Sequence, residues 1–161
     1  MSAPPSLGAL AILAVLALAN LVKGWRFVIG NSRAGARHYF DPEKSAYARN
    51  LPFAHLPLGV GAASLCLAGL AGYLRNGLTE PMAFLMAAIA GASLYLAARW
   101  LASPPAMLKP KWLQSAETGT RAVPRVDGPD RVVLVIMQGL GALVTVLSLG
   151  ALAVALIRLA Y

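Results

Sequence analysis

The sequence predicts an all-α integral membrane protein, a bundle of four transmembrane helices with two basic cytoplasmic loops. Two observations lead to this fold class. Of the 161 residues, 58% are hydrophobic and 12% are charged, whereas soluble domains carry about 45–50% apolar and about 25% charged residues. The apolar residues also stand in four long runs without a charged side chain, which is typical of helices surrounded by lipid. We expect one membrane domain, residues 1–161.

The first apolar run is Met1–Val22, and it predicts a helix over about residues 7–29. Ser6 follows two prolines and can cap the start of this helix. Residues 17–20 (ALAN) resemble a small-residue cleavage site. A secretory signal peptide begins with basic residues, however, and this run has none. We therefore expect the run to be retained as a span.

Three further runs predict the other spans. They are Leu51–Leu74, Pro81–Ala98 and Val132–Ile157, with helices expected over about residues 51–74, 81–101 and 132–158. A spanning helix needs about 20 residues. The last run would be about 39 Å long, so we expect this helix to tilt or protrude. The link Arg75–Glu80 is short and contains Asn-Gly, so the helices on either side of it should be antiparallel neighbours.

The distribution of Lys and Arg predicts the orientation. Six lie between the first and second spans and six between the third and fourth, which makes twelve of the 14 in the chain. The opposite side holds Arg75 and Arg158 alone. Because basic loops stay in the cytoplasm, we expect loops 30–50 and 102–131 to be cytoplasmic and both termini to lie outside. The protein would then be a multi-pass protein of the cell (cytoplasmic) membrane.

Several function classes fit the sequence poorly. The formal charge of +8 would suggest nucleic acid in a soluble protein, but here the bases flank apolar runs and fit anionic lipid headgroups better. The lone Cys66 allows no disulfide or zinc motif within the chain. No Asp, Glu, Lys or Arg lies in the middle of a span, which argues against an ion-coupled transporter. We expect no cofactor and no nucleic-acid partner.

The basic loops contain the candidate binding residues. A phosphate or carboxylate at the inner headgroup level would be held by Arg26, Arg33, Arg37, Arg49, Lys109, Lys111 and Trp112. Guanidinium groups bind such anions in a bidentate manner. The alternative is that these side chains only fix the orientation of the protein and contact lipid headgroups.

Two other polar features have simpler explanations than chemistry. His38, Asp41 and Glu43 could approach a metal ion, but Pro42 separates the two acids and a fourth ligand is missing. We therefore expect no metal site. For His55, we favour an interfacial imidazole bonded to a loop carbonyl over a general base or a haem ligand.

Small residues recur at four-residue spacing or on one face of the later spans. They are Ser64, Ala68 and Gly72, then Ala83, Ala87 and Gly91, and finally Gly141, Thr145 and Ser148. Membrane helices associate where small residues let their backbones approach. We expect these residues to form packing seams within the chain, with a partner protein or a second copy as the alternative.

The first loop resembles two families of four-spanning membrane proteins. Gly35-Ala36-Arg37 is similar to the Gly-x-Arg-Thr element that precedes a span in membrane immunity proteins of the SdpI type. Arg49, Asn50 and Pro57 resemble part of the pattern that enters the second span of membrane-associated glutathione-handling enzymes. The first resemblance implies an immunity-like role and the second a thiol substrate. No catalytic residue is carried over from either family.

The function expected from the sequence is that of a non-enzymatic accessory, interaction or immunity-like component of a bacterial cytoplasmic membrane. Its partners would be anionic membrane lipids and a membrane protein or a second copy. The alternative is a membrane enzyme or carrier that holds an amphipathic, lipid-like or glutathione-like anion with its first-loop arginines.

Overall fold

Four long helices dominate the computed structural model, which describes residues 6–29, 39, 41, 44–73, 79–110, 113 and 128–160. The helices are α1 (Leu7–Ile29), α3 (Ala46–Ala71), α4 (Thr79–Ala102) and α6 (Pro129–Ala160), and a 3-10 turn, η1 (Ala106–Leu108), follows α4. Each long helix is apolar enough to cross a membrane. The expected all-α bundle of four transmembrane helices is therefore confirmed.

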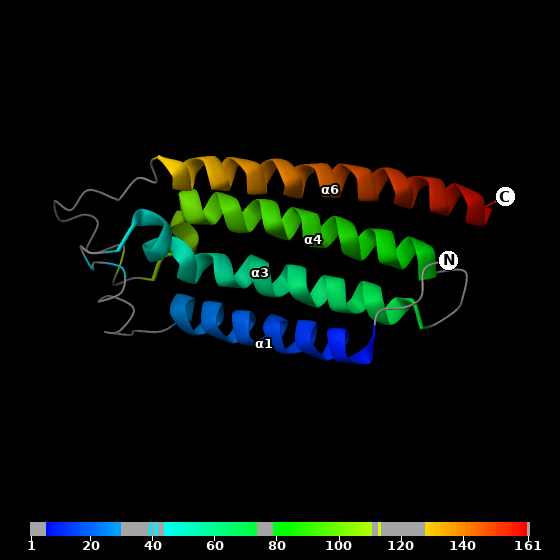
Figure 1. Ribbon diagram of the computed structural model, residues 1–161, viewed down its shortest axis with the longest axis horizontal. Coiled ribbons are helices and arrows are strands. Elements are labelled where there is room, and N and C mark those ends of the chain that lie inside the picture. The colour runs from blue at the N-terminus through cyan, green and yellow to red at the C-terminus, as the bar shows by residue number, and fades with distance from the viewer. Residues whose placement is uncertain are drawn as a thin grey trace.

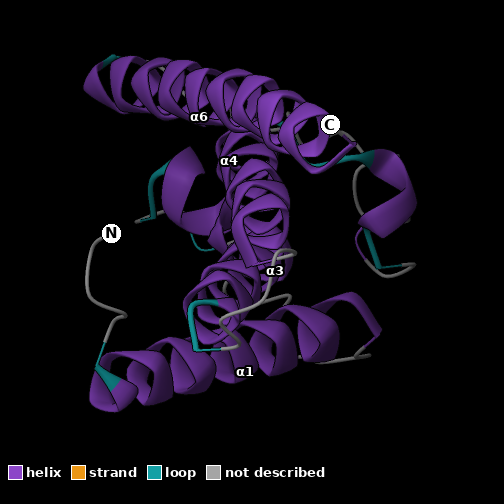
Figure 2. Cartoon of the chain, turned by 90° about the vertical axis from the view of Figure 1, so that its right-hand side faces the viewer, coloured by secondary structure: helices purple, strands orange, loops and turns teal. Residues whose placement is uncertain are grey.

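The helices lie side by side in one open row (Figures 1 and 2). α1 packs against α3, α3 against α4, and α4 against α6. Within the described part of the chain, no other pair of helices makes an extensive contact. Neighbours run antiparallel, so α1 and α4 end where α3 and α6 begin. We call this end of the row the loop end, and the opposite end the terminal end.

Three of the helices begin earlier than the charge-free runs predict, and α4 does so by two residues, at Thr79. α3 starts at Ala46, where Ser45 caps it by accepting a hydrogen bond from the Ala48 N–H at 3.2 Å. α6 starts at Pro129, directly after Gly128, whose φ of 66° is a backbone conformation that favours glycine. The extra first turns contain polar residues and lie outside the apolar runs. Hydropathy alone therefore does not predict them.

The core is concentrated at the loop end. The largest fully buried side chains are Tyr39, Asn50, Phe53, Leu101, Leu113 and Leu134. An aromatic cluster joins the helix ends there, with the ring of Phe53 5.0 Å from that of Phe27 and 6.5 Å from that of Tyr39, both edge to face. Such pairs add about 0.5–1.5 kcal/mol beyond burial. Tyr39 and Leu113 thus anchor parts of both connecting segments to α3.

α1 and α3 meet through two reciprocal glycine–leucine contacts that lie outside the predicted seams. A methyl group added at Gly24 would lie 2.7 Å from Cγ of Leu56, and one added at Gly59 would lie 2.7 Å from Cγ of Leu21. Each leucine therefore occupies the space that a side chain on the facing glycine would need. This close approach is the usual basis of helix association in membranes.

α4 and α6 meet at Gly91, Gly141 and Thr145, three residues of the expected seams. A methyl group at Gly91 would lie 2.7 Å from Oγ1 of Thr145, and one at Gly141 would lie 2.6 Å from the backbone nitrogen of Tyr95. The Thr145 hydroxyl donates to the Gly141 carbonyl at 2.7 Å and approaches the Ala88 carbonyl at 3.4 Å. Backbone contact through glycines therefore holds α6 to the row.

The remaining small residues of the expected seams lie in varied places. Ser64 is buried, and its hydroxyl donates to the Val60 carbonyl of its own helix at 2.9 Å. Four others are half-buried: Ala68, Ala83, Ala87 and Ser148. Gly72 is exposed just beyond the end of α3, where its N–H donates to the Gly69 carbonyl at 3.2 Å. Gly72 therefore closes the helix end.

Candidate functional site

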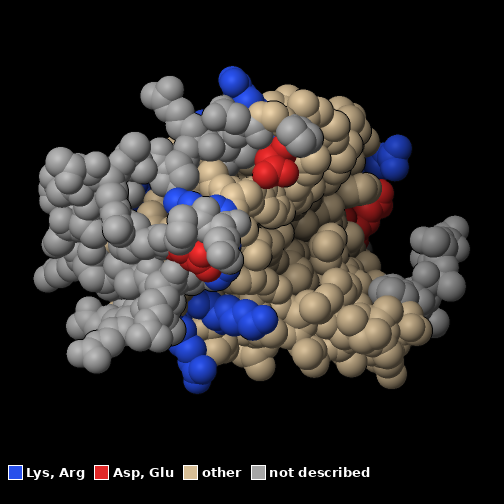
Figure 3. Space-filling view, turned by 60° about the vertical axis from the view of Figure 1, so that its left-hand side comes forward, with Lys and Arg blue, Asp and Glu red and all other residues tan. Residues whose placement is uncertain are grey.

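The loop end carries most of the described charges. Seven bases lie there or in the last two turns leading to it, namely Lys23, Arg26, Lys44, Arg49, Arg99, Lys109 and Arg131. The described acids at this end are Asp41 and Asp130, whereas the terminal end has Glu80 and Arg158. Most Lys and Arg side chains visible in Figure 3 lie on this end. The excess of positive charge suits an anionic surface or ligand.

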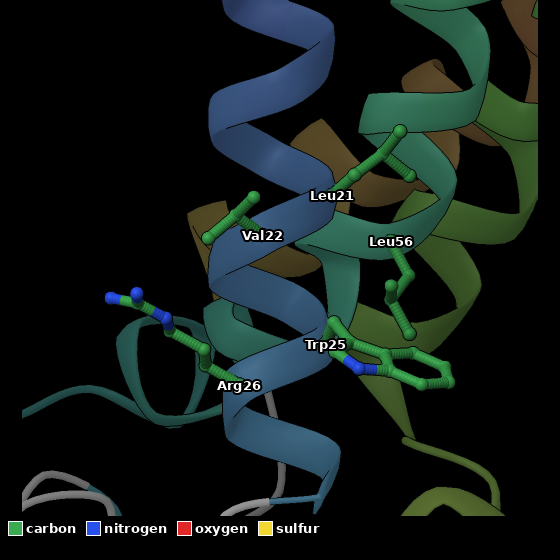
Figure 4. Close-up of a pocket in the computed structure, with 5 residues that line it drawn as sticks. All are labelled: Leu21, Val22, Trp25, Arg26 and Leu56. Atoms are coloured by element: carbon green, nitrogen blue, oxygen red, sulfur yellow. The ribbon is translucent and has the colours of Figure 1, made fainter.

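An open hollow of about 320 Å³ lies on α1 near the loop end, and we call it the α1 hollow. It is lined by Leu21, Val22, Trp25, Arg26 and Leu56. Figure 4 shows the Trp25 ring extending towards Leu56 of α3, while Arg26 points away from α3. The hollow is therefore apolar, with a guanidinium and an indole N–H at its margin. A hydrocarbon chain with an anionic head would be complementary to this lining.

Asn20 of α1 and His55 of α3 form a polar pair next to this hollow. Nδ1 of His55 lies 2.7 Å from Oδ1 of Asn20, and Nδ2 of Asn20 donates to the Leu16 carbonyl at 2.8 Å. The second bond orients the amide, so the network assigns the proton to His55 Nδ1. The expected bond from His55 to a loop carbonyl is thus replaced by a bond to a neighbouring helix.

Arg49 lies in the first turn of α3 and organises the segment before it. Its Nε donates to the Lys44 carbonyl at 2.9 Å. Nζ of Lys44 in turn lies 3.5 Å from Oδ2 of Asp41. Both groups are partly solvent-exposed, so this ion pair contributes little to stability. Arg49 therefore has a structural contact in addition to any role in binding an anion.

Asn50 is the most buried polar residue at the loop end, with 1% of its surface exposed. Its Nδ2 donates to the Leu101 carbonyl at 2.8 Å, and Leu101 lies in the last turn of α4. Carbonyls in a last helical turn have no partner within the helix, so Asn50 caps α4 from the side. Its Oδ1 is also buried, and it has no hydrogen-bond partner among the described residues.

The predicted anion-binding residues are not gathered in one described pocket. Arg26 lines the α1 hollow, Arg49 bonds to the chain before α3, and the half-buried Lys109 follows η1. The other four predicted residues, Arg33, Arg37, Lys111 and Trp112, lie outside the described residues. The structure adds Leu21, Leu56 and the Asn20–His55 pair, whose partners are 35 positions apart in the chain.

Metal and thiol chemistry receive no geometric support from the described residues. Within that part of the chain, no three His, Cys, Asp or Glu side chains are grouped so as to hold a metal ion. His38 and Glu43 of the H-x-x-D-x-E stretch lie outside it. Cys66 is half-buried, and its Sγ lies 3.5 Å from the Leu10 carbonyl.

The described geometry offers a surface for binding. The α1 hollow can accept an apolar chain, and Arg26 and Trp25 can hold a headgroup at its margin. The Asn20–His55 pair joins α1 to α3 directly beside it. Comparisons with protein-family models, curated proteins and solved structures found no match to this chain.

Proposed function

We propose that this protein is a non-catalytic interaction component of a bacterial cytoplasmic membrane, of the accessory or immunity type. The observation that carries the proposal is the open row of helices. α1 and α6 each pack along one side only, and smaller shares of them are buried than of α3 and α4. In a closed four-helix bundle, each helix packs against two neighbours. An open row leaves its outer sides and broad faces available to another membrane chain.

The proposed orientation places the loop end in the cytoplasm and both termini outside. The support is the charge distribution, because bases dominate the loop end, whereas Glu80 and Arg158, the described charges of the terminal end, balance. Positive charge retained in the cytoplasm is the general rule for multi-pass proteins. The anionic inner leaflet would add contacts to exposed bases such as Arg26 and Lys23.

Native mass spectrometry of the protein, extracted from its own membrane in mild detergent, tests the interaction role. We expect a complex of fixed stoichiometry with a second membrane chain, whether a different protein or another copy. A protein that is found alone and turns over a lipid or thiol substrate would contradict the proposal.

The second candidate function is a carrier or enzyme for an amphipathic anion, and the α1 hollow favours it. The expected result is that short-chain phosphatidylglycerol binds the detergent-solubilised protein better than phosphatidylcholine does. Arg26→Gln should weaken that binding about fivefold, the effect of one base near an anionic surface. Arg158→Gln at the terminal end is the matched control and should change nothing.

The first-loop arginines provide a separate test of this candidate. If Arg33, Arg37 and Arg49 hold the head of the ligand, replacing all three by alanine should abolish binding of phosphatidylglycerol and glutathione without changing membrane insertion. Unaltered binding by the triple variant would rule out the carrier or enzyme.

A further inference from the structure

A second hollow lies between the two ends of the row, and we call it the central groove. It has a volume of about 360 Å³ and is lined by all four long helices. Its lining includes Leu13, Gly61, Leu65, Ala90, Ser93 and Val144. Ser93 lies 14 residues from the start of α4 and nine from its end, which corresponds to about 21 and 14 Å along the helix. The groove is therefore deep in the span.

Ser93 is the polar residue among those that line this groove, and no described residue bonds to its hydroxyl. It is 5% exposed, and it makes no hydrogen bond with any described residue. The hydroxyls of Ser64 and Thr145 differ from that of Ser93, because each donates to the carbonyl four residues earlier. A hydroxyl that lacks an acceptor in the bilayer core is unfavourable. The groove thus lacks a hydrogen-bond acceptor that its occupant would supply.

The missing acceptor distinguishes between possible occupants. Lipid tails carry no acceptor, and water is absent from the bilayer core. A transmembrane helix carries a carbonyl oxygen at every residue, and each such oxygen can accept a second hydrogen bond. Hydroxyl side chains commonly bond across membrane helices where small residues let backbones approach. A helix with an exposed glycine is therefore the occupant that satisfies Ser93.

The outer side of α6 presents such a glycine. Gly139 is exposed, and a methyl group added there would meet no other atom within 4 Å. Its depth also matches that of Ser93. Gly141 contacts Gly91 and Tyr95, the residues two positions before and after Ser93, so Gly139 lies within about 3 Å of that level. A second copy inserted in the same orientation would hold its own Gly139 at this depth.

We propose that a second copy of this chain docks the Gly139 side of its α6 into the central groove, where the Ser93 hydroxyl donates to a backbone carbonyl beside Gly139. This proposal rests on the proposed interaction function and names the partner. The two contacting surfaces differ, so each copy can give one and receive the other. Such head-to-tail contacts build closed rings or open chains.

Disulfide cross-linking between two tagged copies tests the contact. Both copies carry Cys66→Ala, one also carries Ser93→Cys, and the other carries Gly139→Cys. Because a disulfide needs Cα atoms within about 7 Å, we expect a cross-linked dimer in membranes after mild oxidation. Leu140→Cys is the matched control, since it is exposed at nearly the same depth but points to another side of α6. Absence of the Ser93–Gly139 product, or equal products with Leu140, would overturn the proposal.

Association in detergent, measured by energy transfer between labelled copies, provides a second readout. Ser93→Ala should weaken self-association about threefold, the average effect of one hydrogen bond between membrane helices. Ser93→Thr should restore it, and Gly139→Leu should weaken it about tenfold by overfilling the contact. Unchanged association in Ser93→Ala and Gly139→Leu would contradict the proposal.

Other outcomes separate this inference from the function on which it rests. A stable complex with a different membrane chain, without the Ser93–Gly139 product, overturns the second copy and keeps the interaction function. No complex of any kind overturns both. A small oxygen-bearing molecule that is seen by native mass spectrometry and lost in Ser93→Ala would replace the helix as the occupant.

Discussion

Asn50 illustrates how one amide can organise the loop end of a membrane protein. Its side chain is buried, and it bonds to the Leu101 carbonyl 51 positions away and so joins the start of α3 to the end of α4. A last-turn carbonyl in an apolar environment needs such a donor. The residue therefore stabilises a helix end as well as an interhelical contact.

Replacing Asn50 by leucine should lower the stability of the protein. The variant leaves the Leu101 carbonyl without its donor, at a cost of about 1–3 kcal/mol. We expect a lower unfolding temperature in a thermal melt in detergent. Gln138→Leu is the control. Gln138 is also a half-buried amide in a span, but its side chain makes no hydrogen bond with the described residues. Equal melting temperatures for wild type and Asn50→Leu would refute the capping role.

The Asn20–His55 bond should appear as an energetic coupling between α1 and α3. Either Asn20→Leu or His55→Leu breaks the same 2.7 Å contact, so the double variant should lose less stability than the sum of the single variants. Hydrogen bonds between membrane helices give couplings of about 0.6–1.7 kcal/mol. A double-mutant cycle of unfolding free energies measures this quantity. Strict additivity would show that the contact contributes nothing.

At the scale of helices, the row is held by two kinds of glycine contact. Leu21 and Leu56 fill the spaces left by the facing glycines, Gly59 and Gly24, between α1 and α3. Backbone atoms meet directly at Gly91 and Gly141 between α4 and α6. Neither kind tolerates a larger residue, because a methyl group at Gly24 or Gly59 would also lie 2.9 Å from the backbone nitrogen of the facing leucine, and a rigid backbone cannot move aside.

Gly91→Leu should therefore separate α6 from α4. The added side chain would overlap Thr145 and the Gly141 carbonyl, and overpacking of this kind costs about 1–3 kcal/mol. We expect faster proteolysis of the α4–α6 connection and a lower unfolding temperature. Gly150→Leu, at a glycine with open space around it, should have no effect on either measurement. Equal proteolysis of the two variants would contradict this description of the seam.

For the whole molecule, the sequence predicts the elements well and their neighbours less well. The four charge-free runs predict the four spans because a bilayer admits little else. The first turn of α3 is missed because Arg49 and Asn50 make it look like a loop. The sequence also does not predict the order of the four helices in the row. The short Arg75–Glu80 link determines only that α3 and α4 are neighbours.

The sequence predicts the site less completely than the fold, because the contacts of the site join residues that are far apart in the chain. Arg26 and Trp25 are recognisable as a base beside an aromatic residue at a span end. No local pattern in the sequence pairs Asn20 with His55. Gly24 lies just beyond the first apolar run, so it is not part of any small-residue pattern within the runs. Contacts between helices depend on packing that one chain's periodicity does not encode.

The most direct measurement on the whole account is the position of the loop end relative to the membrane. Alkaline phosphatase, which is active only outside the cytoplasm, can be fused near Lys44, near Arg121 or after Arg158. We predict an active enzyme after Arg158 and inactive enzymes at the two other positions, because twelve of the 14 bases flank those loops. Active fusions near Lys44 or Arg121, or a chain that stays soluble without detergent, would contradict the account.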